Sequence, residues 1–386
     1  MTLSNASAPI APKPGISEID LYVPGESALA GGAKPIKLSS NESPLGASPS
    51  ARAAMMSALG DLARYPDGSA SALRAAIAER YGLDAARIVC GAGSDELLSL
   101  LANAYLREGD EAIYSAHGFL VYRIVILANG ATPVVAAERD LHTDVDAILA
   151  CVSERTRMVF IANPNNPTGT YIPFDEVRRL RDGLREDILL VLDGAYAEYV
   201  RRNDYESGLE LVAAGTNTVM TRTFSKIHGL AALRLGWMFA PQHICDTVNR
   251  IRGPFNVSAP AIAAGAASIL DRAHEDENVA HNTRWLARMT AAMDELGVEV
   301  TPSAANFVLV HLPEGDGVDA RAAEDHLKAD GILVRRVAGY GLPNALRVSL
   351  GTDEECAAFI ASFTRFRGAS NPRAATVEHD AASPRV

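Results

Sequence analysis

The chain has 386 residues, 48% of them hydrophobic and 22% charged, which is ordinary for a globular protein long enough to form two domains. Its formal net charge of −11 argues against a nucleic-acid-binding protein, because a negative surface repels the phosphate backbone. The four cysteines form no CxxC pair, and no signal peptide or membrane-spanning stretch is found, which predicts a cytoplasmic protein without a structural metal or a membrane partner.

The first 45 residues contain few signs of regular structure. Residues 1–15 are rich in Ala, Ser and Pro, which predicts a flexible N-terminal arm. Beyond them, helical periodicity predicts helices over Pro49–Leu59 and Ser71–Tyr81. The turn Tyr65-Pro66-Asp67-Gly68 separates the two helices.

Short apolar runs alternate with helical segments from Arg87 to about Ala240. The predicted strands are Arg87–Cys90, Glu111–Tyr114, Thr132–Val135, Met158–Ala162, Ile188–Asp193, Thr218–Thr223 and Leu235–Ala240. The predicted helices between them are Ser94–Leu106, Gly118–Leu127, Asp144–Val152 and Phe174–Leu184. Near-continuous apolar strands indicate burial on both faces of a mainly parallel sheet, which is α/β architecture with ligands at the carboxyl ends of the strands.

The alternation ends after Pro260, where an Ala-rich helix (Ala261–Leu270) leads into a long amphipathic helix (His274–Leu296). The remaining elements predict a smaller α+β domain: strands Asn306–Leu312, Ile332–Val337 and Leu346–Leu350, and helices Val318–Asp330 and Asp353–Phe366. We therefore predict a large domain over 46–270, a small domain made of 16–45 with 271–367, and a disordered tail over 368–386.

Lys226 is the first candidate catalytic residue. It follows the hydroxyl residues Thr223 and Ser225 at the end of an apolar run, and Arg234 lies eight positions later. A desolvated lysine has a lowered pKa and can form a Schiff base with a carbonyl, while hydroxyls and an arginine can hold a phosphate. Pyridoxal 5'-phosphate carries both an aldehyde and a phosphate. The alternative for this short segment alone, a surface lysine on a turn, is about equally probable.

Two motifs precede predicted helices. In Gly91-Ala92-Gly93-Ser94-Asp95-Glu96 the glycines and a helix N-terminus form a possible anion cradle, although Ser94 as an ordinary N-cap explains the motif about as well. In His117-Gly118-Phe119 the aromatic ring follows a strand and can stack on a planar cofactor, although core packing is the commoner role of a phenylalanine.

Two polar segments follow buried strands. The rigid turn Asn163-Pro164-Asn165-Asn166-Pro167-Thr168-Gly169 can aim amides at a ligand, and it is more elaborate than a connecting loop requires. Asp193 ends an apolar strand, where a carboxylate is costly unless it is paired, and a protonated pyridine nitrogen is a suitable partner. The ordinary alternative for Asp193 is a helix N-cap. Tyr196, three residues on, can donate to a phenolate oxygen.

Arg335 and Arg347 lie on two predicted strands of the smaller domain. A guanidinium group binds carboxylate or phosphate through two parallel hydrogen bonds, which suits an amino acid or a phosphorylated substrate. A surface ion pair is the usual alternative for any single arginine.

The motifs occur in the order found in the fold-type I pyridoxal-phosphate-dependent aminotransferases, and the chain resembles this family from Gly15 to Phe366. Within class II of that family the chain is most similar to the histidinol-phosphate aminotransferases. The segments that carry the resemblance are PGISEIDLYVPG, NESPLG, RYPDG, GAGSDE, HGFLVY, NPNNPTG, LDGAYAEY, RTFSKIHGLAALRLGW and LRVSLGT.

The resemblance implies a cofactor and a set of site residues. Pyridoxal 5'-phosphate would be bound to Lys226, which would also act as the acid and base of the reaction. The residues implied in cofactor binding are Gly93, Ser94, Asp95, Thr223, Ser225 and Arg234 around the phosphate, Phe119 stacked on the ring, Asn166 and Tyr196 at its oxygen, and Asp193 at its nitrogen. Tyr65 would reach the cofactor of a second copy, which implies a homodimer with a shared site.

The resemblance also implies a substrate. Arg347 would bind its anionic group, with Arg335, Tyr22 and Asn41 around the same pocket. The activity would be reversible amino transfer from glutamate to imidazole-acetol phosphate, which forms histidinol phosphate and 2-oxoglutarate. Three alternatives stay open: an aromatic-amino-acid aminotransferase, a phosphoamino-acid decarboxylase, and a regulator without catalysis. His228, Ala232 and Phe119 depart from residues common in relatives, which puts substrate choice in doubt more than cofactor binding.

Overall fold

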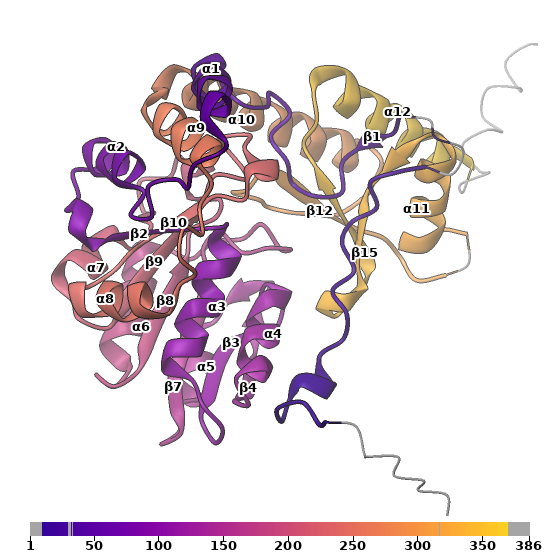
Figure 1. Cartoon of the computed structure of the whole chain (residues 1–386). Helices are drawn as coiled ribbons and strands as arrows, with labels where there is room; N and C mark the ends of the chain where they lie inside the picture. The colour runs from indigo at the N-terminus through magenta and orange to yellow at the C-terminus, as the bar shows by residue number, and fades with distance from the viewer. Residues whose placement is uncertain (1–9, 30–31, 33, 316, 370–386) are drawn as a thin grey trace, which may run out of the picture.

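A computed structural model describes residues 10–29, 32, 34–315 and 317–369, which form two main sheets, each covered by its own helices (Figure 1). The larger sheet has seven strands in the order β2-β10-β9-β8-β7-β3-β4. In that order they span Ile88–Gly91, Gly236–Phe239, Thr218–Thr223, Leu189–Asp193, Thr156–Ala162, Glu111–Ser115 and Thr132–Ala136. Only β10 runs antiparallel to its neighbours, which confirms the predicted mainly parallel α/β sheet.

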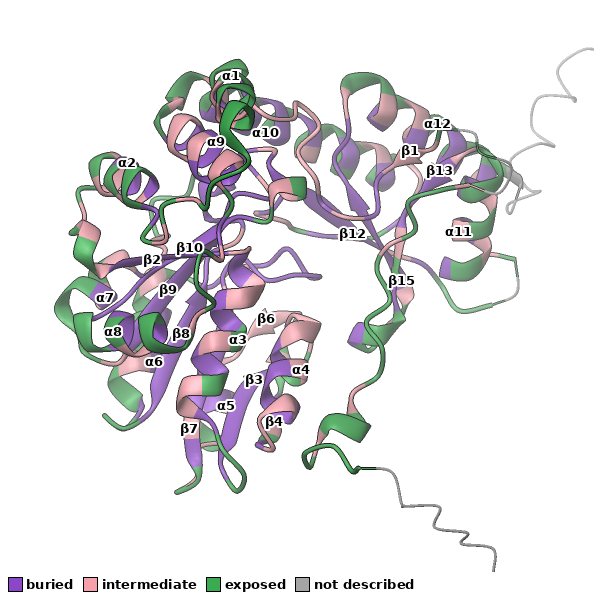
Figure 2. Cartoon of the chain, in the orientation of Figure 1, coloured by how far each residue is buried: buried purple, intermediate pink, exposed green. Residues whose placement is uncertain are grey.

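The central strands are buried on both faces because their side chains alternate between two helical layers. On β8, Val191 packs with α3 (Ser94–Tyr105), α4 (Leu120–Ala128) and α8 (Gln242–Ile251). Leu190 and Leu192 pack on the opposite face with α5 (Val145–Ala150) and α6 (Phe174–Gly183). Figure 2 shows the strands buried and the outer faces of the helices exposed.

A further cluster covers the β2 edge of the sheet. It contains α1 (Pro49–Ala58), α2 (Ser71–Tyr81) and α9 (Ala259–Leu270), which pack against Ile88 and Trp237 of the sheet. The short helix α7 (Leu209–Ala214) contributes Val212 to the same cluster. These helices hold the loop that carries Tyr65 at the surface of the molecule.

The smaller sheet is antiparallel, in the order β11-β12-β15-β14. Its strands span Val300–Thr301, Phe307–His311, Leu342–Ser349 and Arg335–Val337. Its core is formed with three helices, α10 (Arg272–Glu295), α11 (Ala320–Ala329) and α12 (Asp353–Ala369), through large side chains such as Trp285 and Phe359. The limits expected for the two domains, 46–270 and 16–45 with 271–367, remain a prediction.

The N-terminal segment connects the two parts of the molecule. From a 3-10 turn at Ile16–Glu18 beside α4 it runs past β15 to β1 (Ile36–Lys37), as Figure 1 shows in indigo. β1 pairs in parallel with β13 (Ile332–Leu333), next to the smaller sheet. β5 (Glu138–Arg139) and β6 (His142–Thr143) form a separate hairpin.

Some elements differ from the predicted ones. α7 and α8 were not predicted, and the strand expected over Ile332–Val337 divides at Val334, because β13 pairs with β1 whereas β14 pairs with β15. β15 begins at Leu342 rather than Leu346, and α12 continues to Ala369, so residues 368 and 369 are helical rather than part of a tail. Residues 1–9 of the expected arm and 370–386 of the expected tail lie outside the described residues.

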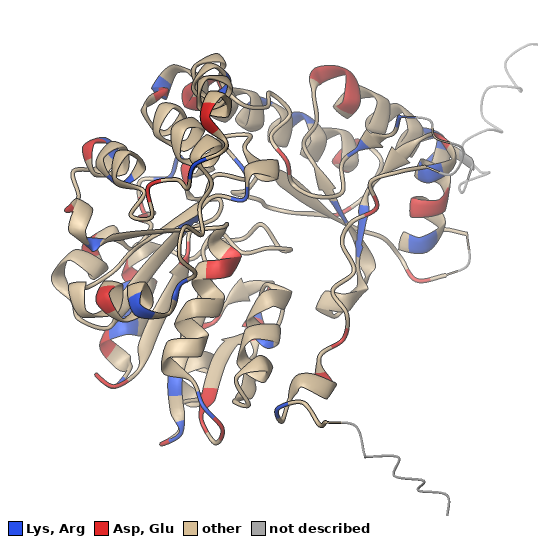
Figure 3. Cartoon of the chain, in the orientation of Figure 1, with Lys and Arg blue, Asp and Glu red and all other residues tan. Residues whose placement is uncertain are grey.

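Charged residues of both signs are interspersed over the helices of both parts (Figure 3). Within the described ranges, none of the helices combines the length and the apolar composition that crossing a bilayer requires.

Candidate active site

A cavity of about 270 Å³ lies between the two sheets, at the carboxyl ends of β7, β8 and β9. Most of the predicted site residues line it: Tyr22, Asn41, Ser94, Asp95, Phe119, Asn166, Asp193, Tyr196, Thr223, Ser225, Lys226, Arg234, Arg335 and Arg347. Strand register explains this convergence, since Asp193 lies beside Ala162 on β7 and Thr221 on β9, so that the loops after these strands share one edge.

Lys226 follows β9, and its Nζ donates a hydrogen bond to the Ser40 carbonyl at 3.2 Å. Burial, followed by the positive charge of Arg347, lowers the pKa of the Lys226 amine to about 8. A much larger fraction of this amine is therefore neutral near pH 7 than of an exposed lysine. A neutral amine is the form that attacks a carbonyl and accepts a proton.

Asp193 ends β8, with its carboxyl group buried at the base of the cavity. Its Oδ2 accepts a hydrogen bond from the Tyr122 hydroxyl at 3.0 Å, and its Oδ1 accepts one from the Ala195 amide at 3.2 Å. Burial raises the pKa of Asp193 to about 6, and hydrogen bonds from Tyr122 and Ala195 oppose that shift. None of the ion pairs found among the described residues includes Asp193, so a cationic ligand group would find an unpaired anion here.

An anion cradle lies where α3 meets the loop that follows β9. Gly93 is in a glycine-favoured conformation (φ +88°), and a Cβ atom there would come within 2.5 Å of Arg234 Nη2. Arg234 also approaches Ser225 Oγ at 3.4 Å and forms an ion pair with Asp95 at 3.0 Å. The residue capping α3 is Gly93 and not Ser94, so the N-cap explanation of that serine is wrong. The open N-terminus of α3 is available to an anion.

Arg347 lies on β15 with its side chain buried. Its Nη1 donates to Asn166 Oδ1 at 2.5 Å and its Nη2 donates to the Ser39 carbonyl at 2.9 Å, while its Nε has no partner within the described ranges. No carboxylate of the described residues pairs with it either. An uncompensated guanidinium in a cavity is a site for a ligand anion.

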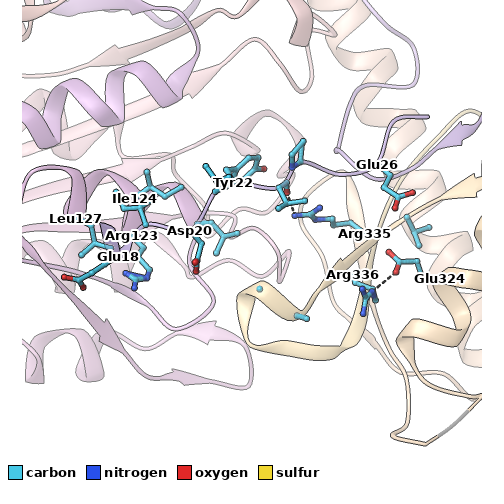
Figure 4. A pocket seen from close by; sticks show the side chains of 18 residues that line it. Glu18, Asp20, Tyr22, Glu26, Arg123, Ile124, Leu127, Glu324, Arg335 and Arg336 are labelled. Atoms are coloured by element: carbon cyan, nitrogen blue, oxygen red, sulfur yellow. Dashed lines mark hydrogen bonds and ion pairs between the residues drawn. The ribbon is translucent and has the colours of Figure 1, made fainter. Parts of the chain in front are cut away.

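The other arginine of the smaller sheet lies at the mouth of the cavity. Arg335 is opposite Arg347 in the strand register, and its Nη2 donates to the Val23 carbonyl at 2.7 Å. Tyr22 is half-exposed and lines the same opening. A second hollow of about 500 Å³ shares Tyr22 and Arg335 and extends under the N-terminal segment toward α4 (Figure 4).

Asn41 and Tyr196 meet inside the cavity. Asn41 Nδ2 donates to the Tyr196 hydroxyl at 2.9 Å, and Ser349 Oγ donates to Asn41 Oδ1 at 3.0 Å. Burial raises the pKa of the Tyr196 hydroxyl, so it remains protonated and can donate to a ligand oxygen.

Tyr65 is the one predicted site residue far from this cavity. It is 83% exposed and stacks on Phe255 with ring centroids 4.7 Å apart. Its predicted contact with the cofactor of a second copy remains a prediction. The departures His228 and Ala232 do not line the cavity either: His228 is buried against Phe224 and bonded to Ser268 Oγ at 3.0 Å.

Sequence reasoning missed several residues of the cavity and its floor. Ser39 and Ser40 contribute carbonyl oxygens to Arg347 and Lys226, and Tyr340 lines the wall. Backbone carbonyls carry no sequence signal, and Tyr340 lies in a short 3-10 helix, Ala338–Tyr340. Tyr122 was detectable, because it lies three residues after Phe119 and so projects from the same end of α4.

These observations test whether pyridoxal 5'-phosphate fits the residues present. The buried, unpaired carboxyl group of Asp193 suits a protonated ring nitrogen, and the cradle at Gly93 and Arg234 has no room for a side chain but suits a phosphate. Lys226 lies between them with a lowered pKa. The residues therefore fit the cofactor, although the role of each remains a prediction.

Proteins similar to this chain in sequence and structure include pyridoxal-phosphate-dependent aminotransferases, in agreement with the residues found in the cavity. The model of the family "Aminotransferase class I and II" matches residues 33–363. Histidinol-phosphate aminotransferases from Rhodopseudomonas palustris strains HaA2 and BisA53 are 57% and 56% identical over 356 residues, 92% of this chain and 98% of theirs. The crystal structure of histidinol-phosphate aminotransferase from Sinorhizobium meliloti in complex with pyridoxal-5'-phosphate is 30% identical with a TM-score of 0.82, over 88% of this chain and 92% of that chain. The chain thus belongs to the class I and II aminotransferases, within them to the histidinol-phosphate aminotransferase family, and it is a pyridoxal-phosphate-dependent enzyme.

Proposed function

We propose that this chain transfers an amino group between L-histidinol phosphate and 2-oxoglutarate, with imidazole-acetol phosphate and L-glutamate on the other side of the equilibrium. The observation that carries the proposal is the buried Lys226 amine in one cavity with an unpaired carboxylate, Asp193, and an unpaired guanidinium, Arg347. The relatives named for this activity, which match 92% of the chain, support the choice of substrate.

The first task of the protein in the reaction is to bind the cofactor. When bound, the cofactor supplies an aldehyde carbon that takes up the amino group and a ring that accepts an electron pair from the substrate's Cα. Asp193 would hold the ring nitrogen in its protonated form through a charge-assisted hydrogen bond. Ser225, Thr223, Arg234 and the amide groups at the start of α3 would hold the phosphate.

Lys226 would move the proton that leaves the substrate's Cα. Once displaced by the substrate amine, its Nζ would act as the base, because burial lowers its pKa to about 8 and so makes the neutral form more accessible than in an exposed lysine. It would carry the proton between the substrate's Cα and the former aldehyde carbon of the cofactor. The same side chain serves both half-reactions, since the second is the first run backwards.

Arg347 would bind both co-substrates in turn. Its guanidinium lines the cavity without a carboxylate partner among the described residues, so its charge would be available to a carboxylate of glutamate or a phosphate of histidinol phosphate, while Asn166 and the Ser39 carbonyl hold it in place. Arg335 and Tyr22 at the cavity mouth would add contacts to the longer, phosphorylated substrate.

We also propose that the active form is a homodimer in the cytoplasm. Exposed apolar side chains gather on and after α1, at Met56, Leu59, Leu62 and Tyr65, with Phe255 beside Tyr65. Exposed apolar side chains favour contact with another protein surface. A second copy packed there would bring Tyr65 to the phosphate of its neighbour's cofactor.

Steady-state kinetics test the proposal. With 2-oxoglutarate as acceptor, kcat/KM for histidinol phosphate should exceed that for phenylalanine by at least about 100-fold, a difference of about 2.7 kcal/mol in transition-state binding. A preference for phenylalanine would identify an aromatic aminotransferase, and release of carbon dioxide without 2-oxoglutarate would identify a decarboxylase. Borohydride reduction followed by peptide mapping should place the cofactor on Lys226, and labelling elsewhere contradicts the assignment.

A further inference from the structure

Tyr122 is a buried tyrosine that none of the roles above requires. It lies in the first turn of α4, is 1% exposed, and stacks on Phe160 with ring centroids 5.0 Å apart. Its edge meets the ring of Phe119, which lines the cavity, at 5.9 Å and 88°. Its hydroxyl donates to Asp193 Oδ2 at 3.0 Å.

This hydroxyl makes the shortest hydrogen bond to the Asp193 carboxyl group found within the described part of the chain. The Ala195 amide lies at 3.2 Å and Thr221 Oγ1 at 3.5 Å, both from Oδ1. Oδ2 therefore depends on Tyr122 for its direction. The stacked ring of Phe160 and the perpendicular ring of Phe119 restrict rotation of the Tyr122 phenol, so the donor is fixed by packing.

The other ionisable groups around Asp193 do not replace this donor. Asp95 on α3 acts on the carboxyl group as a like charge, and Tyr196, Tyr205 and Lys226 surround it without a hydrogen bond to either of its oxygen atoms in the described residues. The buried carboxylate thus relies on neutral donors for stability until a cationic ligand arrives.

We propose that Tyr122 is a positioning residue for Asp193, holding the carboxylate ionised and turned toward the cavity through its hydroxyl while its ring supports Phe119. Asp193 would then present an oriented anion to the ring nitrogen of the cofactor, and Phe119 would present a ring held in place by packing. The effect on cofactor binding rests on the proposed function. The effect of Tyr122 on the Asp193 carboxyl group does not, because their hydrogen bond forms within the chain without the cofactor.

Tyr122→Phe removes the hydroxyl and keeps the ring. In the protein prepared without cofactor, the carboxyl pKa of Asp193 is measured by NMR of aspartate labelled with 13C at Cγ, with Asp193→Asn to assign the signal. Loss of the donor destabilises the ionised form, so the pKa should rise by about one unit. The dissociation constant of pyridoxal 5'-phosphate should rise about tenfold, the effect of losing one hydrogen bond to a charged group.

The matched control is Tyr114→Phe. Tyr114 belongs to the same aromatic cluster, with its ring 6.4 Å from that of Tyr122, but no hydrogen bond joins its hydroxyl to Asp193. This variant should leave both the pKa and the dissociation constant unchanged. In an Asp193→Asn background, Tyr122→Phe should have no further effect on cofactor binding, because its acceptor has lost its charge.

A Tyr122→Phe protein that folds with the wild-type Asp193 pKa overturns the proposal, whether or not the enzyme is a transaminase. If that variant does not fold, 3-fluorotyrosine placed at position 122 keeps the ring and makes the hydroxyl a stronger donor. The Asp193 pKa should then fall, and an unchanged value overturns the proposal equally. Failure of the proposed function alone would appear as wild-type protein that does not turn over histidinol phosphate.

Discussion

At the scale of single residues, the site is defined by three charged groups that the protein itself leaves without opposite charges. Asp193 and Arg347 are buried and Lys226 is partly buried, and no ion pair of the described residues neutralises any of the three. Isolated buried charges cost free energy of folding, and they persist where a ligand completes them. Their ionisation and their pairing with ligands are therefore the properties to measure.

The pKa of Lys226 sets a pH dependence for its reaction with an aldehyde. Only the neutral amine attacks, so in protein without cofactor the rate of pyridoxal 5'-phosphate attachment should rise about tenfold per pH unit and level off above about pH 8. Stopped-flow absorbance measures the rate, with Lys226→Ala as the blank. A rate that still rises toward the ordinary lysine pKa of 10.5 would show that burial does not act on this amine.

Replacing Arg347 should weaken both co-substrates together. Arg347→Lys keeps the charge but loses the two parallel hydrogen bonds, so KM should rise about 10- to 100-fold for histidinol phosphate and for 2-oxoglutarate. The control is Arg336→Lys on the neighbouring strand, where the guanidinium pairs with Glu324 at 2.6 Å outside the cavity. A rise in KM for only one co-substrate would mean that the two anions bind at different cations.

At the scale of elements, parallel strands and the helices that follow them bring the site together. β7, β8 and β9 end at one edge, and Gly93 at the start of α3 lies beside the Arg234 side chain from the loop after β9, in a backbone conformation (φ +88°) that favours glycine. A backbone without side chains can approach a phosphate, and the amide groups of the helix N-terminus then act as donors.

Gly93→Ala tests the cradle. The new Cβ would fall 2.5 Å from Arg234 Nη2 in a backbone conformation with φ +88°. We expect the free energy of unfolding to fall by about 1–3 kcal/mol and the dissociation constant of the cofactor to rise at least about tenfold. Thermal unfolding and fluorescence titration measure these effects. Gly60→Ala, at a site with nothing within 4 Å, is the control and should change neither value.

At the scale of the whole molecule, the cavity lies between the two sheets, and one predicted cofactor ligand lies away from it. The smaller sheet supplies Arg347 and Arg335, the larger supplies Lys226 and Asp193, and the N-terminal segment runs between both. Tyr65 is exposed beside Phe255 and does not line this cavity. Its contact with the cofactor of a second copy is a proposal that can be tested.

Hybrid dimers test that arrangement. Tyr65→Ala and Lys226→Ala should each lose most of their activity as homodimers. When the two variants are unfolded and refolded together in equal amounts, half of the dimers should be mixed, and each would contain one intact site. Activity should then recover to about a quarter of the wild-type value. If no activity returns although mixed dimers form, Tyr65 serves its own chain. A Tyr65→Ala homodimer that keeps the wild-type activity would show that Tyr65 has no role in the site.

The sequence by itself determined the strands, most of the helices and the candidate site residues. Apolar runs such as that of β8 and the small polar motifs after each strand depend on local chemistry, which the order of residues records directly. Lys226, Asp193, Asn166 and Arg234 were identified in this way, and the structure places them around one cavity.

Only the tertiary structure decided which groups meet. The hydrogen bond from Tyr122 to Asp193 joins residues 71 positions apart, and the contacts of Arg347 and Lys226 with the Ser39 and Ser40 carbonyls span still longer separations. Long-range pairing also divided the strand at Val334 between two partners. These contacts depend on how whole elements pack and on backbone carbonyl oxygen atoms, which every residue has. No local sequence pattern therefore predicts them.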